Sequence, residues 1–282
     1  MDTKASVIVR SFNRLPALLE LLDVLRTQKY KNFEIIIVEQ STNYEGNDWE
    51  KLNEIEAEDH RIKLLKYTPL GGPKARNEGV KNATGEILIF IDDDDLPFSD
   101  QWVAEHVEAY KDPMLIGFTG RHVLNDKTGD PYKDWVKPFF KKKCMRYSYL
   151  KFPYTYAQLK VNIKGVEWLH GTNSSVRRKW AIKAGLWDED IRHQDEHSFA
   201  FKLNRILDEN HHIDFRQKPE LIRRTDISGG MNKRNFNMID EFKNQLNFCF
   251  KVIYRYHKHL IILFPFHIAS VVIKTVKFKI MN

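Results

Sequence analysis

Apolar and polar residues follow two alternating patterns along the first hundred residues of the chain. Short apolar runs typical of buried strands alternate with longer segments in which apolar residues recur at helical spacing. The expected strands are 5–9, 33–39, 62–68 and 86–91, and the expected helices between them are 15–30, 49–60 and 73–84. The run at 33–39 is apolar without alternation, which fits a strand covered by helices on both faces. This order predicts an α/β fold with a doubly wound, mostly parallel sheet.

The second half of the chain is less regular. It contains a basic, aromatic stretch at 137–156, a polar loop at 170–178, a short helix around 179–185 and a mixed segment at 191–207. Strong breakers between two domains are absent. We therefore expect one domain over residues 1–235, with halves of about 1–98 and 99–235, followed by a helical extension over 236–282.

Composition and charge narrow the class of protein. The chain has 282 residues, of which 42% are apolar and 29% charged, a globular composition without repeats. Its net charge of +7 equals the charge of residues 242–282, which contain seven Lys and Arg and no Asp or Glu. A nucleic-acid-binding protein would carry its basic patch on the folded domain, so we expect no nucleic-acid partner.

Two further features bear on the cellular compartment. Cys144 and Cys249 are too few for a disulfide framework, which fits a reducing compartment. The first ten residues contain no apolar stretch of signal-peptide length before the first expected strand. We therefore expect the protein in the cytoplasm.

Polar residues follow each of the first four expected strands. In a doubly wound sheet, ligands bind beyond the carboxyl ends of the strands, so these residues should share one edge. They are Arg10, Ser11 and Asn13 after the first strand, Glu39 and Gln40 after the second, Gly71 and Gly72 after the third, and Asp92, Asp93, Asp94 and Asp95 after the fourth.

The four consecutive aspartates need something to offset their repulsion, which is about 4 kcal/mol for a pair 4 Å apart near a protein surface. A solvated acidic turn is one interpretation. The other is a divalent-cation site, because Mg²⁺ takes one or two carboxylates and completes its shell with waters and substrate phosphates. In an extended segment Asp92 and Asp94 would point one way and Asp93 and Asp95 the other. The glycine-containing loop 70–73 and Arg76 would suit a nucleotide diphosphate bridged by the metal.

Four sequence blocks in this order resemble the inverting family 2 glycosyltransferases of the GT-A fold. The blocks are SVIVRSFNR (6–14), IIIVEQST (35–42), GGPKARNEGVKNATGEILIFIDDDD (71–95) and GTNSSVRRKWAIKAGLWDEDIRHQDEHSFAFKLNR (171–205). The resemblance covers roughly residues 5–215. It implies a GT-A type, Rossmann-like central sheet, with the nucleotide sugar bound by the first half of the domain and the acceptor by the second.

The resemblance also implies roles for individual residues. Asp94 would be the main ligand of Mn²⁺ or Mg²⁺, helped by Asp92, and Asp195 would be the general base that deprotonates the acceptor hydroxyl. The residues implied to contact the nucleotide sugar are Ser11, Phe12, Arg14, Glu39, Arg76, Asp92 and Asp93. Those expected near the acceptor are His170, Gly171, Thr172, Asn173, His193 and His197. Asp95 is expected only to shape the turn. The implied partners are a nucleotide-sugar donor, with a uridine diphosphate sugar favoured by the resemblance alone, and a glycan or lipid-linked acceptor.

Two departures from the family pattern qualify these roles, and one absent motif bears on processivity. Glu39 and Gln40 replace a pair of aspartates, which leaves open the base of the donor. Gln194 replaces an acidic neighbour of Asp195 and so removes a like charge that would raise its pKa. The Gln-x-x-Arg-Trp motif of processive synthases is absent, so we expect transfer of a single sugar.

Other interpretations stay open at this stage. HQDEH (193–197) matches the H-x-x-E-H signature of a zinc metalloprotease. A sugar nucleotidyltransferase would also combine a nucleotide site with metal carboxylates, although the expected Gly-rich loop after the first strand is absent. A non-catalytic binding module is a third alternative. The stretch 137–156 suits a lid over the acceptor, a lipid-facing surface or a solvated loop.

The segment 246–280 is apolar and aromatic, interrupted by cations. Its longest uncharged run, residues 260–273, has 14 residues, short of the roughly 20 needed to span a bilayer. A pair of interfacial helices on anionic headgroups fits better, which would place the protein peripherally on the inner face of the membrane. The alternative is a helix packed on the domain or across a homodimer.

Overall fold

The computed structural model describes residues 3–44, 46–124, 129–191, 194–224, 227 and 238–281. Its elements in chain order are β1 (Ala5–Ser11), α1 (Leu15–Arg26), β2 (Phe33–Glu39), α2 (Asp48–Glu58), β3 (Ile62–Lys66), α3 (Gly72–Asn82), β4 (Ile87–Asp92), β5 (Asp95–Pro97), α4 (Trp102–Glu108), η1 (Ala109–Lys111), β6 (Leu115–Leu124), α5 (Lys137–Lys143), β7 (Arg146–Tyr147), β8 (Pro153–Tyr154), β9 (Ile163–Lys164), β10 (Ser174–Arg177), α6 (Arg178–Lys183), α7 (Asp195–Ile206), β11 (His212–Arg223), α8 (Met238–Asn247), η2 (Phe248–Ile253), α9 (Tyr254–Tyr256), η3 (Lys258–Leu263) and α10 (Phe264–Met281).

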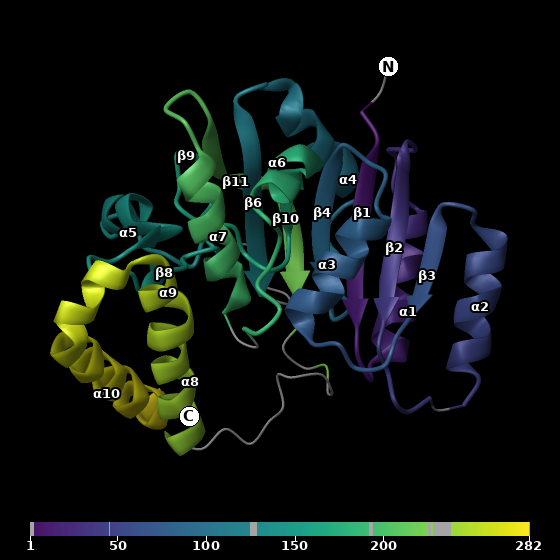
Figure 1. Cartoon of the computed structure of the whole chain (residues 1–282). Coiled ribbons are helices and arrows are strands. Elements are labelled where there is room, and N and C mark those ends of the chain that lie inside the picture. Colours follow the sequence, from purple (N-terminus) through teal and green to yellow (C-terminus); the bar gives the residue numbers. More distant parts are fainter. Residues whose placement is uncertain are drawn as a thin grey trace.

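A nine-stranded sheet runs through the centre of the molecule (Figure 1). Its strand order is β3-β2-β1-β4-β10-β6-β11-β5, with β9 paired to β11. Strands β3, β2, β1 and β4 pair in parallel, which confirms the predicted doubly wound half. Further along, β6 and β11 are parallel, whereas β10 runs antiparallel to both β4 and β6.

Helices cover both faces of the sheet, as the unalternated apolar strands predicted. Val7 and Val9 of β1 face the cluster formed with α1, α2 and α4, whereas Ile8 between them faces the cluster formed with α3, α6 and α7. Each face therefore has its own hydrophobic core. Helix α1 ends at Arg26, four residues before the predicted end.

The antiparallel strand β10 was not predicted from the sequence. Its residues are SSVR, and polar side chains are normally a poor indication of a buried strand. Ser175 is fully buried. Its hydroxyl tolerates burial because it accepts a hydrogen bond from Tyr110 (2.9 Å) and lies 3.0 Å from His106 Nδ1. These partners come from other elements, so the strand is stabilised by contacts that only the folded chain supplies.

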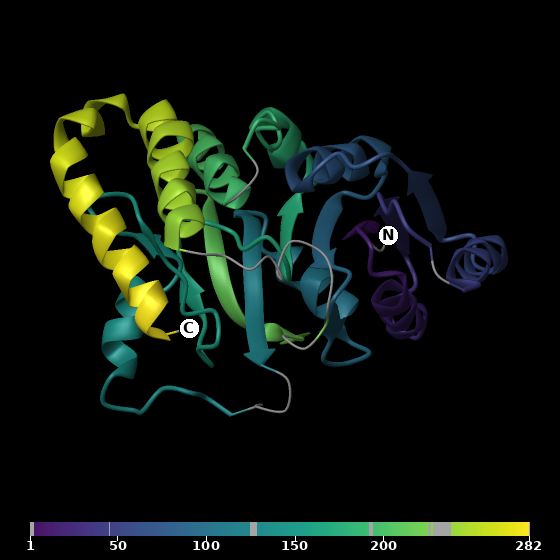
Figure 2. The ribbon, with the colours of Figure 1, turned by 90° about the horizontal axis from the view of Figure 1, so that it is seen from below.

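The C-terminal helices lie at the end of the molecule opposite α2, beside α5 and α7 (Figures 1 and 2). Phe248, Val252 and Val271 are buried in a third cluster together with Phe201 of α7 and Phe152. His267 Nε2 lies 3.1 Å from the carbonyl of Leu150. The extension is thus packed on the domain over part of its surface. The predicted boundary near residue 235 lies outside the described residues.

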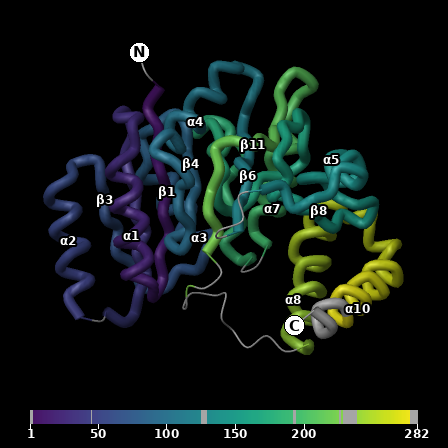
Figure 3. Tube along the Cα trace, turned by 180° about the vertical axis from the view of Figure 1, so that it is seen from behind, coloured from purple at the N-terminus to yellow at the C-terminus, as the bar shows by residue number. Residues whose placement is uncertain are grey.

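The outer surface of this extension is apolar. The stretch Lys258–Val276 is long and apolar enough to cross a membrane by length and composition, with 22% of it buried against the protein. The uncharged run alone is shorter because Lys258 and Lys274 lie near the ends of this stretch. Figure 3 shows α10 running along the outside of the molecule.

Candidate active site

The carboxyl ends of β1, β2 and β4 meet at one edge of the sheet. Their parallel register places Arg10 opposite Asp92 and Ser11 opposite Glu39. The polar strand ends therefore lie side by side, as the sequence predicted for this sheet edge.

The four aspartates occupy a turn between two strands. Asp92 ends β4, Asp93 and Asp94 form the turn, and Asp95 begins β5. The turn breaks the alternation expected of an extended segment. Carboxylate oxygens of Asp92, Asp94 and Asp95 lie within 4.8 Å of one another. Asp95, expected only to shape the turn, therefore shares this carboxylate cluster with Asp92 and Asp94.

Arginines pair with the aspartates and offset their mutual repulsion. Arg10 donates two hydrogen bonds to Asp92, at 2.7 and 3.1 Å. Arg14 forms ion pairs with Asp93, at 2.5 Å, and with Asp94. Two further arginines, at and just after the end of β11, also contact the aspartate turn. Arg223 Nε lies 3.7 Å from Asp95, and Arg224 Nε donates a hydrogen bond to the Asp94 carbonyl at 3.0 Å.

Burial and nearby charges shift the pKa values of these carboxyls in opposite directions. Burial raises the pKa of Asp93 to about 7, although the nearby Arg14 opposes the shift. Burial likewise raises the pKa of Asp95 to about 7, with Arg223 opposing it. Burial would also raise the pKa of Asp92, but the charge and hydrogen bonds of Arg10 outweigh burial and hold it below its usual value. Asp92 is thus the carboxylate held most firmly in its charged form among these three.

The carboxylate cluster suits a hard divalent cation. All of its candidate ligand atoms are carboxylate oxygens, the ligands preferred by Mg²⁺ and Mn²⁺. Asp92 and Asp94, the predicted ligands, are both among them. The donor set therefore fits the metal that the sequence predicted, with Asp95 as a third candidate ligand.

Ser11, Phe12 and Glu39 lie around the ends of β1 and β2. The Phe12 backbone N–H donates to Asp93 at 3.4 Å, and Ser11 is buried. Glu39 is fully buried; its Oε1 accepts from the Ser41 N–H, whereas Oε2 has no hydrogen-bond partner among the described residues. A buried carboxylate oxygen without a partner is costly and is readily explained by a donor group that a ligand would bring.

Arg76 and Asp195 form a buried ion pair between α3 and the first residue of α7. Arg76 Nη1 pairs with Asp195 Oδ2, and Arg76 Nη2 donates to the Gly171 carbonyl at 3.3 Å. Arg76 is 3% and Asp195 6% exposed. Burial raises the pKa of Asp195 above its usual value, with Arg76 opposing and Glu196 adding to the shift.

The space between this pair and the aspartates is narrow. A gap lined in part by Arg10, Arg76, Asp92 and Gly171 has no room for a water molecule. A Cβ atom on Gly171 would lie 2.7 Å from Arg76 Nη2, so a glycine here allows the guanidinium to pass. The aspartate turn and the buried pair Arg76–Asp195 are thus neighbours, and Arg10 and Arg76 both line the gap between them.

Asn77 fixes the loop that leads toward Asp195. Its side-chain amide donates to the Trp187 carbonyl at 3.0 Å and to Glu189 at 3.1 Å, and its carbonyl oxygen accepts from the Trp187 N–H at 3.0 Å. Adjacent residues of α3 therefore hold both Asp195 and the segment before it.

The predicted acceptor loop leads directly into β10, and its side chains at Thr172 and Asn173 form hydrogen bonds within the protein. Thr172 donates to Asp95 at 2.9 Å and accepts from the Asp92 N–H at 3.2 Å. Asn173 accepts from Trp102 Nε1 at 2.8 Å and donates to the carbonyls of Arg121 and Pro219. Both side chains are buried. Their internal hydrogen bonds support a structural role, in which they hold the loop in place, and not direct contact with an acceptor. His170 and Gly171 are partly exposed.

The two predicted acceptor histidines of α7 and the preceding segment have different outcomes. His193 lies outside the described residues. His197 is 3% exposed, its Nδ1 is 3.1 Å from the Tyr147 hydroxyl, and its ring packs on Trp168. Burial lowers the pKa of His197 to about 3. In this conformation the His197 side chain is buried and lies against Tyr147 and Trp168; within the described chain, only Asp92, Asp94 and Asp95 group as candidate metal ligands.

Sequence reasoning did not assign site roles to Arg10, Asn77, Arg223 or Arg224. The sequence placed Arg10 on this sheet edge, but its pairing with Asp92 was not predicted. The pair Arg223–Arg224 gave no such signal, because β11 was not predicted. Its antiparallel pairing with β5, in which Arg223 lies opposite Asp95, is what brings its C-terminal end to the aspartates.

Solved structures similar to this chain share its fold. One is the S. aureus protein TarS, residues 1–349, in complex with UDP-GlcNAc: TM-score 0.60, 15% sequence identity, covering 86% of this chain and 64% of that one. Another is the mannosyltransferase PcManGT from Pyrobaculum calidifontis in complex with GDP-Man and Mn²⁺: TM-score 0.59, 17% identity, covering 87% and 61%. At these identities the likeness establishes the GT-A fold and no more.

Sequence relatives point the same way. The amylovoran biosynthesis glycosyltransferase AmsB of Erwinia amylovora is 31% identical over 135 residues, 44% of this chain and 44% of that protein. A GalNAc(5)-diNAcBac-PP-undecaprenol beta-1,3-glucosyltransferase of Campylobacter jejuni is 33% identical over 94 residues, 33% of this chain and 30% of that protein. The matched segment thus spans less than half the length of either relative. The family model described as glycosyl transferase family 2 matches residues 6–183, more than half of this chain. The chain therefore belongs to glycosyl transferase family 2.

Proposed function

We propose that the protein transfers one sugar, with inversion, from a nucleotide diphosphate sugar to a hydroxyl of a glycan or lipid-linked acceptor. The observation that carries this proposal is the arrangement at the sheet edge, where a carboxylate cluster lies next to the buried pair Arg76–Asp195. The first can hold a metal and a diphosphate, and the second can supply a base beside them.

The donor would bind across the ends of β1, β2 and β4. Glu39 Oε2 offers an acceptor for a donor group of the base, and Ser11, Phe12 and Arg14 lie at the adjacent strand end. A uridine diphosphate sugar is the donor we favour. The UDP-GlcNAc bound to TarS supports this choice, whereas the GDP-Man bound to PcManGT shows that this fold also accepts another base.

Asp94 and Asp92 would hold Mn²⁺ or Mg²⁺, with Asp95 in reach. When bound, the divalent ion stabilises the negative charge that develops on the departing diphosphate. The Mn²⁺ in the PcManGT complex supports a divalent metal without specifying the ion for this chain. Asp92 and Asp94 are now paired with Arg10 and Arg14, so these arginines would turn toward the diphosphate when the carboxylates take up the metal.

Asp195 would act as the general base. A base must lie within hydrogen-bond reach of the hydroxyl it deprotonates, and a carboxylate whose pKa is raised accepts that proton more readily. Arg76 now occupies Asp195 Oδ2. An arriving diphosphate would compete for Arg76, because charge-assisted pairs with phosphate oxygens are strong. Donor binding would then free Asp195 for the acceptor.

The acceptor would be a glycan carried on a membrane lipid, reached from the inner face of the membrane. The undecaprenol-linked substrate named for the Campylobacter relative supports this class of acceptor. Exposed apolar side chains on the C-terminal extension support membrane association, and they include Ile262 at 80%, Phe266 at 64% and Ile273 at 67% exposure. A homodimer that covers this surface is the alternative.

The donor proposal is tested with a panel of nucleotide sugars, with and without Mn²⁺ or Mg²⁺, scored for nucleotide release and thermal stabilisation. We expect metal-dependent stabilisation and release of a nucleoside diphosphate with one donor sugar. Release of inorganic pyrophosphate from a nucleoside triphosphate and a sugar phosphate would instead indicate a nucleotidyltransferase.

Membrane association is tested with substitutions, because deleting the extension would also expose Phe201 and Phe152. Replacing Ile262, Phe266 and Ile273 with serine removes exposed apolar surface and leaves that cluster intact. We expect this variant to move from the membrane fraction to the soluble fraction. A variant that stays fully membrane-bound would contradict the proposal.

A further inference from the structure

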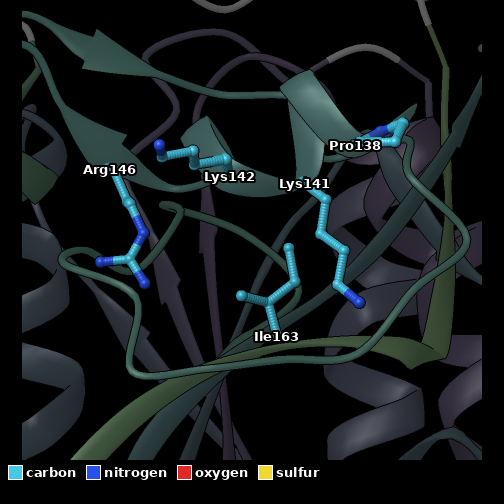
Figure 4. Close-up of a pocket in the computed structure, with 5 residues that line it drawn as sticks. All are labelled: Pro138, Lys141, Lys142, Arg146 and Ile163. Atoms are coloured by element: carbon cyan, nitrogen blue, oxygen red, sulfur yellow. The ribbon is translucent and has the colours of Figure 1, made fainter. Parts of the chain in front are cut away.

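A basic pocket lies on the flank of the molecule, away from the aspartates. It is open, has a volume of about 680 Å³, and is lined by Pro138, Lys141, Lys142, Arg146 and Ile163. In Figure 4 the two lysines of α5, Arg146 at the start of β7 and Ile163 of β9 surround the same space. The pocket thus has an apolar wall at Ile163 and three cations around it.

These three cations have no acidic partner in the described part of the chain. Neither an ion pair nor a side-chain hydrogen bond joins Lys141, Lys142 or Arg146 to a described residue. Their neighbours differ, since Lys137 pairs with Asp130 and Asp134, and Lys143 lies over the rings of Phe139 and Tyr154. Three unpaired cations around one pocket repel one another, so a bound anion would be stabilised there.

Helix α5, which carries two lysines of the basic pocket, lies at the same end of the molecule as the apolar C-terminal helices (Figures 1 and 2). The segment around β8 contacts both α5 and α10. The ammonium group of Lys143 of α5 lies over the Tyr154 ring, and that of Lys274 of α10 lies 3.5 Å from the centre of the Phe152 ring. Exposed aromatic side chains also occur in α5 and close to it in the sequence, with Trp135 at 80%, Phe139 at 54% and Tyr149 at 82% exposure.

This combination has the chemistry of a membrane interface. Trp and Tyr concentrate at the level of lipid headgroups, and Lys and Arg beside them attract anionic lipids. From residue 137 to residue 146 the chain carries four Lys and one Arg and no acidic residue. The C-terminal extension beyond residue 242 is likewise basic without acidic residues. Charge and apolar exposure therefore agree at this end of the molecule.

We infer that the basic pocket is a binding site for the phosphate of an anionic lipid headgroup, and that it docks the catalytic domain on the bilayer together with the C-terminal helices. The inference rests on the proposed membrane association and adds to it a second, specific contact from within the catalytic domain. Two contacts would fix the orientation of the domain on the surface, whereas an apolar extension alone would not.

The test compares two triple variants of equal net charge. In the pocket variant Lys141, Lys142 and Arg146 become glutamine. In the control variant three lysines near the opposite end of the sheet, Lys29, Lys51 and Lys63, become glutamine. Binding is measured by flotation on vesicles of phosphatidylcholine alone and of phosphatidylcholine with phosphatidylglycerol, and light scattering gives the mass of each protein in solution.

We expect wild-type protein to bind the anionic vesicles, and the pocket variant to bind them on the order of 100-fold more weakly, since each cation near the surface contributes about one factor of five. The control variant should keep near-wild-type affinity, because its charges lie farther from the membrane than the screening length. Equal losses in both variants would overturn the inference, since net charge would then explain binding. Equal binding of the wild type to both vesicle types would also overturn it.

Two further readouts separate this inference from its alternatives. A wild-type dimer that becomes monomeric in the pocket variant would identify a second copy of the chain as the occupant and overturn the lipid assignment. Nucleotide release in vesicle-free solution reports the proposed transfer separately. Loss of vesicle binding with unchanged nucleotide release supports the inference, and the vesicle result stands even if no nucleotide sugar is turned over.

Discussion

The sharpest prediction concerns the substitution Asp195→Asn. The amide has nearly the shape of the carboxylate, so its oxygen can still accept a hydrogen bond from Arg76. It cannot accept the proton of an acceptor hydroxyl at neutral pH. The substitution therefore removes the proposed base while keeping the contact that joins α3 to α7.

The expected effect is a loss of two to four orders of magnitude in the rate of transfer. A positioned general base typically contributes a factor of about 10² to 10⁴, which corresponds to about 3 to 5 kcal/mol of activation free energy. Donor affinity should change at most a few-fold, because most predicted donor contacts lie on β1, β2 and the aspartate turn, and Arg76 on α3 keeps a hydrogen-bond acceptor at residue 195. The loss should therefore fall on kcat, with the donor KM within a few-fold of wild type.

Glu196→Gln is the matched control, since it removes the next carboxylate on the same helix. Burial raises the pKa of Asp195, and the Glu196 charge adds to that shift. Because the base works only when ionised, wild-type activity should fall as the pH decreases through this raised pKa, above the usual aspartate value of 3.8. Glu196→Gln should keep activity and move this acid limb to lower pH.

The assay is transfer to an acceptor measured across pH, with thermal melting as a check on folding. Transfer by Asp195→Asn within about threefold of wild type would refute the assignment of the base. An acid limb that does not move in Glu196→Gln would show that the limb reports a different group. A large fall in Tm for Asp195→Asn would point to a structural role, which Asp195→Glu would then separate by restoring the charge.

Three other predictions concern the metal and the stability of the fold. Asp94→Asn should weaken Mn²⁺ binding at least about tenfold, measured by titration, whereas Asp100→Asn outside the cluster should not. Leu22→Ala should lower the urea-derived free energy of unfolding by about 2 to 5 kcal/mol because Leu22 is fully buried, and the half-buried Leu19→Ala should cost less. Hydrogen bonds from Arg61 lower the pKa of Asp59 to about 2 from 3.8, so their stabilisation is complete above pH 3.8 and is lost as the pH falls toward 2. The Tm difference between wild type and Asp59→Asn should accordingly shrink between pH 6 and pH 2.

The first half of the fold was predictable because its signals are local. Val7, Ile8 and Val9 form an unbroken apolar run, and only a strand covered on both faces buries such a run. Once the strands are parallel and the connections right-handed, their carboxyl ends must share an edge. The proximity of Glu39 and Asp92 to the end of β1 follows from the order of residues alone.

The second half was not predictable because its signals are tertiary. The strand residue Ser175 is polar, and its burial depends on Tyr110 and His106, which are distant in the sequence. Thr172 and Asn173 look like free acceptor ligands in the sequence, yet the folded chain gives each of them internal partners.

The amino-acid sequence by itself determined the doubly wound sheet, the clustering of aspartates at its edge and the family. The tertiary structure decided how the repulsion between those aspartates is offset, because it pairs them with arginines from β1, from the loop after β1 and from the C-terminal end of β11. It also decided that Asp195 meets Arg76 and that α5, which lines the basic pocket, lies beside the C-terminal helices. The physical reason is range: hydrophobic periodicity acts between neighbours along the chain, whereas charge pairing and burial depend on which distant segments the fold brings together.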